Sequence, residues 1–415
     1  MNDIAVLKFG GTSVKNIGRI QHVCQIIDDV RAHQKTLVVV SAMGDTTDYL
    51  LKLAKQCTGT PDKRELDLLL STGEQISISL LAMTLRSLGL RARSFTGQQV
   101  GIFTESVHNK ARIVDVNASK LTSAFEENDV IVVAGFQGVT ESGDITTLGR
   151  GGSDTTAVAL AAAVHAPVCD IYTDVDGIYT SDPNVIRSAR LLNRISYGEV
   201  LEMARLGAQV IHPRAVELAR QYGIKLRVRN TFKPEHQGTV IDGGGSDMEI
   251  FRTVSGVAID KDQSCVAILD VPDQPGIAGK ITQALADQNI VIDMIMQSFH
   301  PSIGLNNITF TVNDADLDQT INSLRFVKEK LGAKDVIADA DIAKVSLIGA
   351  GMAGQPQIAA KLFAVLGTAG INIKMISSSE MKITCVVSRD QAEAAAKLIH
   401  DAFELQGVPE ASQQK

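Results

Sequence analysis

Hydrophobic positions in the first 230 residues form short strand-like runs, separated by longer stretches with helical spacing. The runs are rich in valine and isoleucine; they are IAVLKFGG, TLVVVSAM, DVIVVAGFQG, VCDIYTDVDG and IKLRVRN. Between them lie amphipathic stretches such as GRIQHVCQIIDDVRAH and VELARQYG. This alternation predicts βαβ units and an α/β fold with a mainly parallel sheet sandwiched by helices. Catalytic groups are then expected at the carboxyl ends of the strands.

The pattern changes after residue 232. A polar, glycine-rich stretch, Lys233 to Ile250, predicts a linker. Beyond it the chain repeats itself, because Gly276–Ile295 lines up with Gln357–Ile376 about 80 residues later. In each copy the order of strands and helices is βαββαβ, which predicts two ferredoxin-like domains. The expected domains are 1–232, 233–252 (the linker), 253–335 and 336–415.

Composition and charge narrow the possible functions only a little. The 415 residues carry a formal charge of −7, which argues against nucleic acid or an anionic membrane as the main partner. No apolar run approaches the length that spans a bilayer, and the N-terminus lacks the features of a signal peptide. The five cysteines are scattered without a CxxC pair, so we expect buried thiols rather than metal or disulfide sites. A cytoplasmic protein is expected.

The stretch VSLIGAGMAG, residues 345–354, matches the GxGxxG fingerprint of dinucleotide-binding loops. Its context argues against NAD(P). The aligned stretch in the first repeat, VPDQPGIAG, has no such motif, and only about 60 residues follow Gly354. Where an acidic residue should meet the ribose, the chain reads Asn372-Ile373-Lys374. The sequence therefore favours a tight turn in the second repeat over a cofactor loop.

A stronger signal lies at the other end of the chain, in Lys8-Phe9-Gly10-Gly11-Thr12-Ser13. Glycines let backbone N–H groups approach an anion, and the N-terminus of the following helix adds positive potential. Lys8 supplies a mobile charge that can reach phosphate oxygens. The alternative is a strand-to-helix turn that merely needs glycine, with a solvated lysine.

A second glycine-rich loop, Leu148-Gly149-Arg150-Gly151-Gly152-Ser153-Asp154, also opens a helical stretch. Arg150 can bind a carboxylate, and the loop amides with Ser153 can hold another anion. Asp154 is either an N-cap or a partner that orients a catalytic lysine. Glu74, inside a mainly apolar helical run, is either an exposed residue or a carboxylate aimed at a substrate ammonium.

A third cluster runs from Thr173 to Pro183 at the end of a strand and offers ring, hydroxyl and carboxylate groups for a nucleotide. Asx turns and proline-built turns would explain most of the same residues. His212, beside Pro213, is expected at a helix start. No Ser/His/Asp triad or HExxH pair appears, so the set of cation, amide nests and acids favours phosphoryl transfer.

With KFGGTSV, SAMGDTTD, STGEQIS, GRGGSD and TDVDGIYTSDP in one order, the chain resembles the aspartate kinases of the amino-acid kinase superfamily. The C-terminal repeat resembles the paired ACT domains of that family. The resemblance implies ATP-dependent phosphorylation of the side-chain carboxylate of L-aspartate, with Mg²⁺, in the biosynthesis of lysine, threonine and methionine. The nucleophilic carboxylate is ionised at pH 7, so no protein base is needed.

The resemblance also implies a role for each matching residue. Lys8 would stabilise the charge of the transferring phosphoryl group, and Asp154 would orient the Lys8 side chain. The ATP contacts would be Lys8, Phe9, Gly10, Gly11, Ser13, Ser41, Ser153, Thr173, Asp174, Tyr179, Asp182 and Gln209. Aspartate would be held by Thr47, Glu74, Arg150, Gly151, Gly152 and Ser153, with Glu74 at its ammonium and Arg150 at its α-carboxylate. Amino-acid effectors would bind Asp273, Gly276, Ile277, Ala278, Gln297, Asn372, Ile373 and Ser378.

Four points have more than one interpretation on the sequence. Relatives often have lysine where this chain has Gln209, so weaker ATP binding is expected there. The effector, lysine or threonine or both, is undecided, since Ser378 stands where threonine is common. Homo-oligomers through the ACT domains are expected, and Met248 is either an ordinary linker residue or the start of an ACT-only subunit. A kinase for another acidic amino acid and a ligand sensor with an inactive kinase domain are the alternatives.

Overall fold

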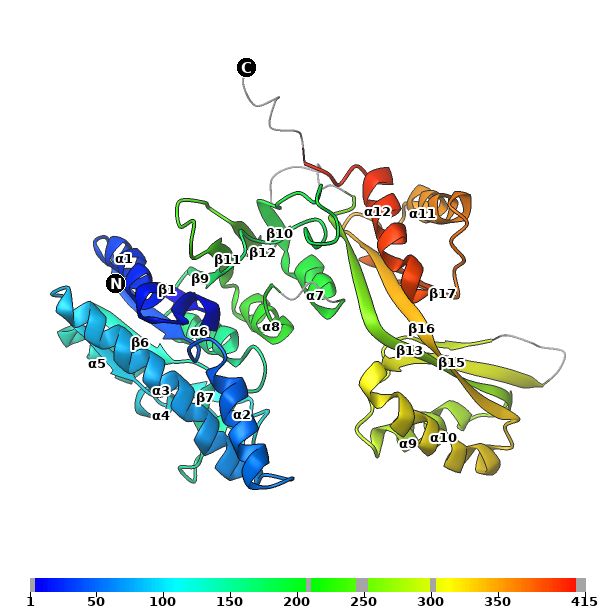
Figure 1. Cartoon of the computed structure of the whole chain (residues 1–415), viewed down its shortest axis with the longest axis horizontal. Helices are drawn as coiled ribbons and strands as arrows, with labels where there is room; N and C mark the ends of the chain where they lie inside the picture. Colours follow the sequence, from blue (N-terminus) through cyan, green and yellow to red (C-terminus); the bar gives the residue numbers. More distant parts are fainter. Residues whose placement is uncertain (1–3, 207–209, 244–252, 299–303, 408–415) are drawn as a thin grey trace, which may run out of the picture. The chain divides into compact units, whose positions relative to one another are not determined.

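The computed structural model describes residues 4–206, 210–243, 253–298 and 304–407. They form two compact units, each with its own sheet (Figure 1). Of the described residues, the first unit contains 4–179, 190–205 and 210–243. The second unit contains 180–189, 206, 253–298 and 304–407.

The first unit is built on an eight-stranded sheet in which every neighbouring pair is parallel except β11 with β12. In spatial order the strands are β10 (Arg194–Ser196), β12 (Thr239–Asp242), β11 (Lys225–Asn230), β9 (Val168–Thr173), β1 (Ile4–Phe9), β2 (Lys35–Val40), β6 (Val130–Ala134) and β3 (Ala92–Phe95). A small second sheet has the order β5 (Ile113–Val116), β4 (Ile102–Thr104), β7 (Gln137–Val139) and β8 (Ile145–Thr147).

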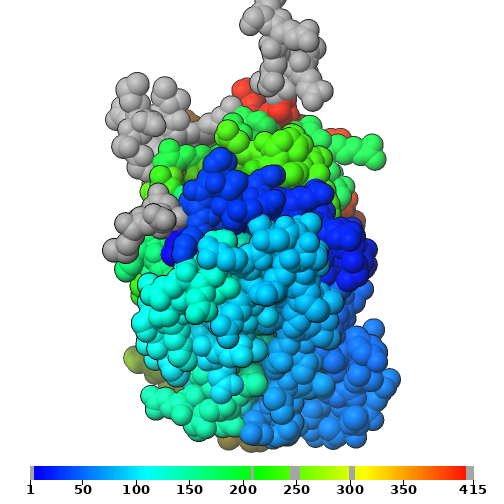
Figure 2. Space-filling view, turned by 90° about the vertical axis from the view of Figure 1, so that its left-hand side faces the viewer, coloured from blue at the N-terminus to red at the C-terminus, as the bar shows by residue number. Residues whose placement is uncertain are grey.

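Helices cover the larger sheet. They are α1 (Ile17–Arg31), α2 (Thr46–Cys57), α3 (Lys63–Ser87), α4 (Gly97–Val100), α5 (Ala118–Glu127), α6 (Gly152–Ala163), α7 (Tyr197–Arg205) and α8 (Pro213–Tyr222), with a short 3₁₀ turn η1 (Gly11–Val14). Strands β2 and β6 are buried along almost their whole length, as expected for parallel strands with helices on both faces. Figure 2 shows one face of this unit, formed largely by the blue and cyan segments of the first third of the chain. The predicted parallel α/β fold is confirmed.

Strand β12 lies inside residues 233–252, where the sequence predicted a linker. It pairs antiparallel with β11, and Ile241 is completely buried. The strand is only four residues long and lies among glycines and charged residues, so the hydrophobic pattern of the sequence did not indicate it. Residues 244–252, including Met248, lie outside the described residues.

The second unit has one antiparallel six-stranded sheet. In spatial order its strands are β14 (Ile295–Gln297), β15 (Leu305–Asn313), β13 (Gly256–Pro272), β16 (Asp335–Ile348), β18 (Lys382–Val387) and β17 (Met375–Ser378). Its helices are α9 (Ile277–Ala286), α10 (Leu317–Leu331), α11 (Pro356–Thr368) and α12 (Ala392–Ala402), with 3₁₀ turns η2 (Asp314–Asp316) and η3 (Arg389–Gln391). The two βαββαβ repeats predicted from the sequence are therefore present.

The repeats share their two longest strands. The second half of β13 pairs with the first half of β16, while Gly256–Asp260 pairs with the end of β16 in the other half of the sheet. Val257 accordingly packs with Leu347 in the core of the second repeat, and Val266 packs in the core of the first. The start of β13 thus supplies the last strand of the second repeat, although it precedes the first repeat in sequence.

Residues 180–189 also belong to the second unit, although the first four of them form the end of the third predicted site cluster. Ile186 is 2% exposed and lies in the same core as Val257 and Leu347. The Thr180 hydroxyl lies 3.0 Å from Nε2 of His400 on α12. No pattern in the sequence indicated that this loop would be part of the C-terminal core.

Helix α3 is the longest helix of the first unit and unusually apolar. Within the described residues it alone is long and apolar enough to cross a membrane, although no such stretch was expected from the sequence. Half of its apolar window is buried in the structure, and its buried face carries Asp67 and Glu74. We therefore interpret it as a core helix of the first unit.

Candidate active site

Lys8 lies near the end of β1, the strand between β9 and β2. Its ammonium nitrogen is 2.6 Å from Oδ1 of Asp154, and each side chain is only 11% exposed. Asp154 is in the first turn of α6, whose N-cap position is occupied by Gly151. The alternative that Asp154 is the N-cap is therefore wrong. The structure joins the first two predicted clusters through a largely buried ion pair.

The glycine turn after Lys8 is held by the neighbouring strand. The Gly10 N–H donates to the Tyr172 carbonyl at 3.2 Å, and Phe9 stacks on the Tyr172 ring. The Ser13 hydroxyl is completely buried and lies 2.7 Å from the Thr231 hydroxyl. The 3₁₀ turn η1 comes directly after Gly10, and α1 begins only at Ile17. Because the Gly10 and Ser13 N–H groups already have backbone acceptors, Lys8 is the group at this turn that can attract an anion.

Glu74 points inward from α3. It is 2% exposed, which rules out the alternative of an exposed residue. Oε1 accepts the Ala42 N–H at 3.0 Å, whereas Oε2 is buried without a partner. The close approach of α3 depends on Gly73, where a Cβ would lie 2.9 Å from that of Ala42. Burial raises the pKa of Glu74 to about 8.

A half-satisfied buried carboxylate is suited to a cationic ligand. Two further predicted residues lie at the same strand end as Ala42: Ser41 directly follows β2, and its N–H donates to Phe9. Thr47 is in the first turn of α2 and is half-buried. The region after β2 and the buried face of α3 therefore form one side of the site.

The GRGGSD loop joins β8 to α6. Gly149 and Gly151 have φ angles of 78° and 66°, a region that favours glycine. A Cβ at Gly151 would lie 2.1 Å from the His212 ring, so glycine is also required by packing. Arg150 is exposed, and among the described residues it has no hydrogen bond or ion pair. Its guanidinium is available to an anion.

His212 is the N-cap of α8 and accepts the Arg214 N–H through Nδ1, as predicted for a helix start before proline. Burial lowers its pKa, which favours the neutral ring. Ser153 is 7% exposed and lies next to Gly135, where a Cβ would be 2.7 Å from Oγ. Both residues therefore have a packing role that the structure shows directly.

In the third cluster, the carboxylates have different partners. Asp176 accepts hydrogen bonds from Asn230 and, at 3.0 Å, from Lys233, while Tyr179 lies 3.4 Å away. Asp174 is exposed, and the Thr173 hydroxyl donates to it at 3.3 Å. The alternative of a purely structural turn therefore fits Asp176 best.

Two predicted nucleotide residues are not placed with this cluster. Asp182 belongs to residues 180–189 of the second unit, where its Oδ1 accepts the Asn184 N–H at 2.8 Å. Gln209 lies outside the described residues. Thr231, the partner of Ser13, was missed; it follows β11 at the carboxyl end of the strand, which is the signal that could have found it.

The predicted effector residues fall into two separate groups. Asp273, Gly276, Ile277 and Ala278 lie at the turn from β13 into α9, and Gln297 ends the edge strand β14. Asn372 and Ile373 precede β17, and Ser378 ends it at the opposite edge. Five strand spacings separate the two edges, roughly 24 Å. A single chain does not bring Gln297 and Ser378 together.

Comparisons with known proteins agree with this architecture. The amino acid kinase family model matches residues 3–230, and ACT domain models match 266–329 and 345–403. The aspartokinase of Thermus thermophilus is 46% identical over 97% of this chain and 99% of its own. Aspartokinase 2 of Bacillus subtilis is 46% identical over 98% of this chain and 99% of its own.

Solved structures are similar over nearly the same length. E. coli aspartokinase III in complex with aspartate and ADP (R-state) has a TM-score of 0.81 and 25% identity, covering 96% of this chain and 99% of its own. The same enzyme in complex with lysine and aspartate (T-state) has a TM-score of 0.76 and 26% identity, with the same coverage.

Proposed function

The chain belongs to the amino acid kinase family and, within it, to the aspartokinases, and from this premise we propose that it phosphorylates the side-chain carboxylate of L-aspartate with ATP. The observation that carries this proposal is the buried Lys8–Asp154 pair beside the glycine turn at the end of β1. The similar E. coli enzyme was crystallised with aspartate and ADP, which supports the same pair of ligands here.

The reaction needs positioning and charge neutralisation rather than a protein nucleophile. An oxygen of the aspartate side-chain carboxylate attacks the γ-phosphorus, a new O–P bond forms, and the bond from the γ-phosphorus to the β,γ-bridging oxygen breaks. ADP leaves with the electron pair of that bond. Lys8, held by Asp154, stabilises the negative charge on the transferring group, which lies beside the open space at Gly10.

The charges of the substrate match the open groups of the site. Oε2 of Glu74 accepts from the α-ammonium, because it is buried and otherwise unpartnered. Arg150 binds the α-carboxylate through its unpaired guanidinium, and Thr47 contributes a hydroxyl. The ammonium would favour ionised Glu74 and so offset the effect of burial on its pKa.

We place the nucleotide against Thr173, Asp174 and Tyr179, with Asp182 and Gln209 as further contacts. Among the described residues, no three His, Cys, Asp or Glu side chains are grouped to hold a metal ion. Mg²⁺ would be held chiefly by phosphate oxygens and would neutralise the charge of the polyphosphate. Asp174, exposed and beside the end of β9, is the carboxylate best placed to assist.

We further propose that lysine, threonine or both regulate the enzyme through the ACT repeats, and that it works in the cytoplasm as a homo-oligomer. The separation of the two effector groups supports a site completed by a second chain. Met248 is a proposed start of an ACT-only subunit. An SDS gel of the product of the native gene would then show a second band of roughly 18 kDa, and its absence would remove this part of the proposal.

Hydroxylamine trapping tests the main proposal. The purified protein is incubated with ATP, Mg²⁺ and hydroxylamine, and with aspartate, glutamate or acetylglutamate as acceptor. We expect hydroxamate with aspartate at a rate well above the other two. No hydroxamate from aspartate would overturn the assignment, and product from another acceptor would identify the rival kinase.

A further inference from the structure

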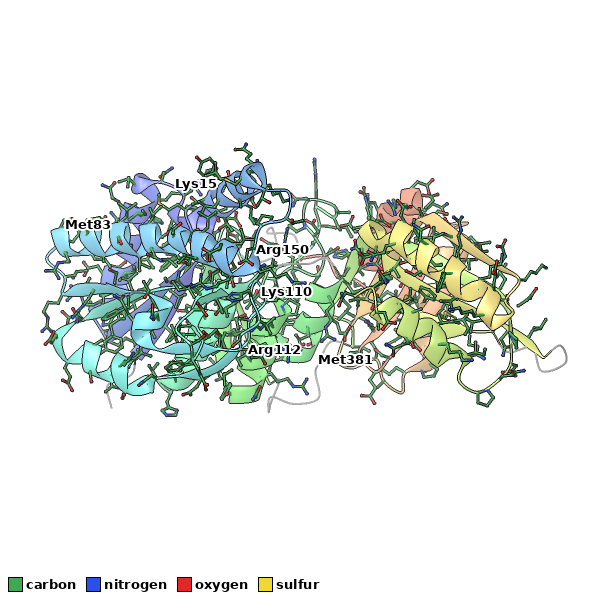
Figure 3. The ribbon with its side chains drawn as sticks, turned by 90° about the horizontal axis from the view of Figure 1, so that it is seen from below. Lys15, Met83, Lys110, Arg112, Arg150 and Met381 are labelled. Atoms are coloured by element: carbon green, nitrogen blue, oxygen red, sulfur yellow. The ribbon has the colours of Figure 1, made fainter. Side chains whose placement is uncertain are left out.

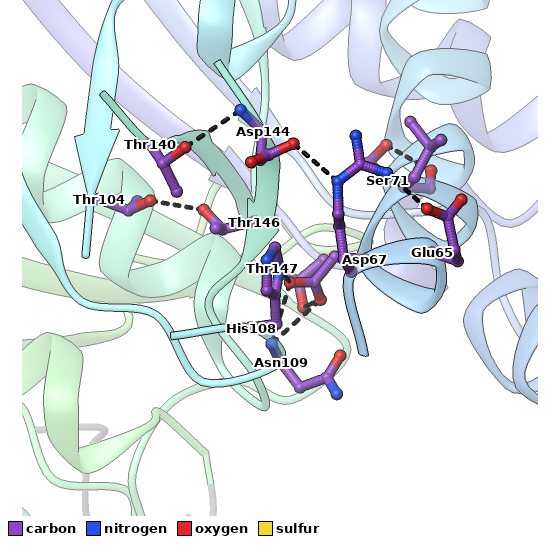
Figure 4. Close-up of polar contacts among 12 residues, drawn as sticks. Glu65, Asp67, Ser71, Thr104, His108, Asn109, Thr140, Asp144, Thr146 and Thr147 are labelled. Carbon is purple, nitrogen blue, oxygen red and sulfur yellow. Dashed lines mark hydrogen bonds and ion pairs between the residues drawn. The ribbon is translucent and has the colours of Figure 1, made fainter. Parts of the chain in front are cut away.

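Helix α3 carries a second buried carboxylate, seven residues before Glu74 and therefore on the same face. Asp67 is completely buried. Unlike Glu74, it is fully surrounded by donors: Nδ1 of His108 at 2.7 Å, the Asn109 N–H at 3.0 Å, and the Thr147 hydroxyl (Figure 4). An ionised carboxylate only accepts, so Nδ1 of His108 carries the hydrogen in this pair.

These bonds join α3 to two segments at the substrate side of the site. His108 and Asn109 belong to the loop between β4 and β5, and Thr147 is the last residue of β8. Thr147 stands three residues before Arg150, and its carbonyl accepts the Ala111 N–H at 3.0 Å. Asp67 thus fixes α3, the loop and the start of the GRGGSD turn against one another.

A second clamp holds the same two segments from α8. The Arg214 guanidinium donates to the Leu148 carbonyl at 2.9 Å and to the Ala111 carbonyl at 2.7 Å. Burial and the charge of Arg112 lower the pKa of Arg214, but it stays a cation at neutral pH. The loop and the turn are therefore tied together on both sides.

The loop then lies directly on the turn. Asn109 has a φ angle of 68°, and its carbonyl would be 3.1 Å from a Cβ at Gly149. The Lys110 side chain would be 3.7 Å from the same Cβ. Lys110, Arg112 and Arg150 are labelled in Figure 3. The contacts of Asp67 therefore help to fix the GRGGSD turn, which carries Arg150, relative to α3.

We propose that Asp67 is a positioning residue that sets the distance between Glu74 and Arg150, and with it the length of the amino diacid that the enzyme accepts. This inference rests on the proposed function, because it takes Glu74 and Arg150 as the contacts of the α-ammonium and α-carboxylate. If that end of the substrate is held rigidly, a side chain with one methylene reaches the γ-phosphoryl group, and one with two methylenes overshoots. Weakening the hydrogen bonds of Asp67 should therefore reduce the preference of the enzyme for aspartate over glutamate.

Asp67→Asn tests the inference with little change in volume. The amide of the variant can accept through one oxygen only. Its NH₂ group is a donor and cannot accept a hydrogen bond from the Asn109 N–H. We expect KM for aspartate to rise roughly tenfold, as for loss of hydrogen bonds to a charged group. The ratio of kcat/KM for aspartate to that for glutamate should fall severalfold, while KM for ATP stays unchanged.

Thr147 gives an independent pair of variants should Asp67→Asn fold poorly. Thr147→Val removes only the hydroxyl and should show the same fall in the aspartate-to-glutamate ratio, whereas Thr147→Ser keeps the hydroxyl and should retain the wild-type ratio. The matched stability control is Asp62→Ala, which removes the exposed N-cap of α3 without touching the loop. It should lower the unfolding temperature and leave the ratio unchanged.

The outcomes separate the two levels of inference. A wild-type protein that forms no hydroxamate from aspartate contradicts the proposed function. Wild-type activity together with an unchanged aspartate-to-glutamate ratio in Thr147→Val, or an equal loss in Asp62→Ala, overturns the role of Asp67 and leaves the function intact. A lower ratio in Asp67→Asn and Thr147→Val, with Thr147→Ser like wild type, supports it.

Discussion

Of the glycine-rich turns in this chain, one follows β1 and another follows β16, and only the turn after β1 has the features of a ligand site. The first, residues 8–13, is in the first unit; the second, residues 349–354, is in the second unit and matches a dinucleotide fingerprint. At Gly349 a Cβ would lie 2.1 Å from the Thr253 carbonyl oxygen, and at Gly351 it would lie 3.0 Å from the Thr253 Cα. Those glycines are needed because another stretch of backbone passes against them.

The first turn differs in its surroundings. A Cβ at Gly10 would meet nothing closer than the Lys8 ammonium nitrogen at 3.6 Å. At Gly11 a Cβ would lie 2.8 Å from the Ala42 carbonyl oxygen, so this turn also contains a glycine that backbone packing requires. What the turn at residues 349–351 lacks is the ion pair of a lysine and an aspartate beside the open position. Glycine spacing alone is therefore a poor guide to a phosphate site, and a paired cation on the preceding strand is a better one.

Replacing Lys8 should break the first turn's function most severely. Lys8→Ala removes the charge that stabilises the transferring phosphoryl group, so kcat in the hydroxamate assay should fall by about 10²–10³-fold or more. Lys15→Ala is a matched control, because Lys15 is exposed in the same segment and the charge change is equal. Full activity in Lys8→Ala would mean that the phosphoryl group is transferred elsewhere.

Glu74→Gln should have the next largest effect. Loss of the charge facing the substrate ammonium is expected to lower kcat/KM for aspartate roughly 10- to 100-fold. Because the pKa of Glu74 in the free protein is about 8, wild-type KM for aspartate should fall as the pH rises towards 8. In Glu74→Gln this dependence should be lost, and an unchanged pH profile would contradict the assignment.

The same group predicts a stability difference whose sign is fixed by linkage. Burial raises the folded pKa of Glu74 from 4.5 to about 8, so the folded state binds the proton more tightly. Relative to Glu74→Gln, the wild-type free energy of unfolding should fall as the pH rises from about 4.5 to 8, by on the order of 5 kcal/mol. Thermal unfolding of both proteins across that range measures the difference, which saturating aspartate should reduce.

The sequence predicted those parts of the molecule that depend on local pattern. The valine-rich runs indicated the parallel sheet, because a buried parallel strand is apolar on both faces. Partners distant in sequence were not foreseen: the Ser13 hydroxyl lies against Thr231, 218 residues away, and Ile186 packs in the core of the second repeat. The hydrophobic periodicity of a sequence does not indicate which loop will contact which strand. For the same reason the hydrogen bond between Asp67 and Thr147 was not predicted.

Gly349→Ala should sharpen the comparison by affecting stability alone. The added Cβ must displace backbone at Thr253, which we expect to cost about 1–3 kcal/mol of unfolding free energy. Kinase activity without effector should stay near wild type at temperatures where the variant is folded. Gly367→Ala, at an open position in α11, is the control and should stabilise by about 0.5–1 kcal/mol. A loss of ATP binding in folded Gly349→Ala would restore the case for a nucleotide loop there.

Gln209→Lys should have the smallest effect. It tests whether an added positive charge increases the affinity for the phosphates of ATP. The proposed function takes Gln209, at a position where relatives often have lysine, as a nucleotide contact. An added ammonium near a solvent-accessible polyphosphate is worth about 1 kcal/mol or less. We therefore expect KM for ATP to fall only a few-fold with kcat unchanged, and the gain to shrink as salt screens the charge. Gln209→Met, without charge or hydrogen-bonding capacity, should move KM for ATP in the opposite direction. Equal values in both variants would mean that this position does not contact ATP, and that Lys8 with its glycine turn supplies the phosphate affinity.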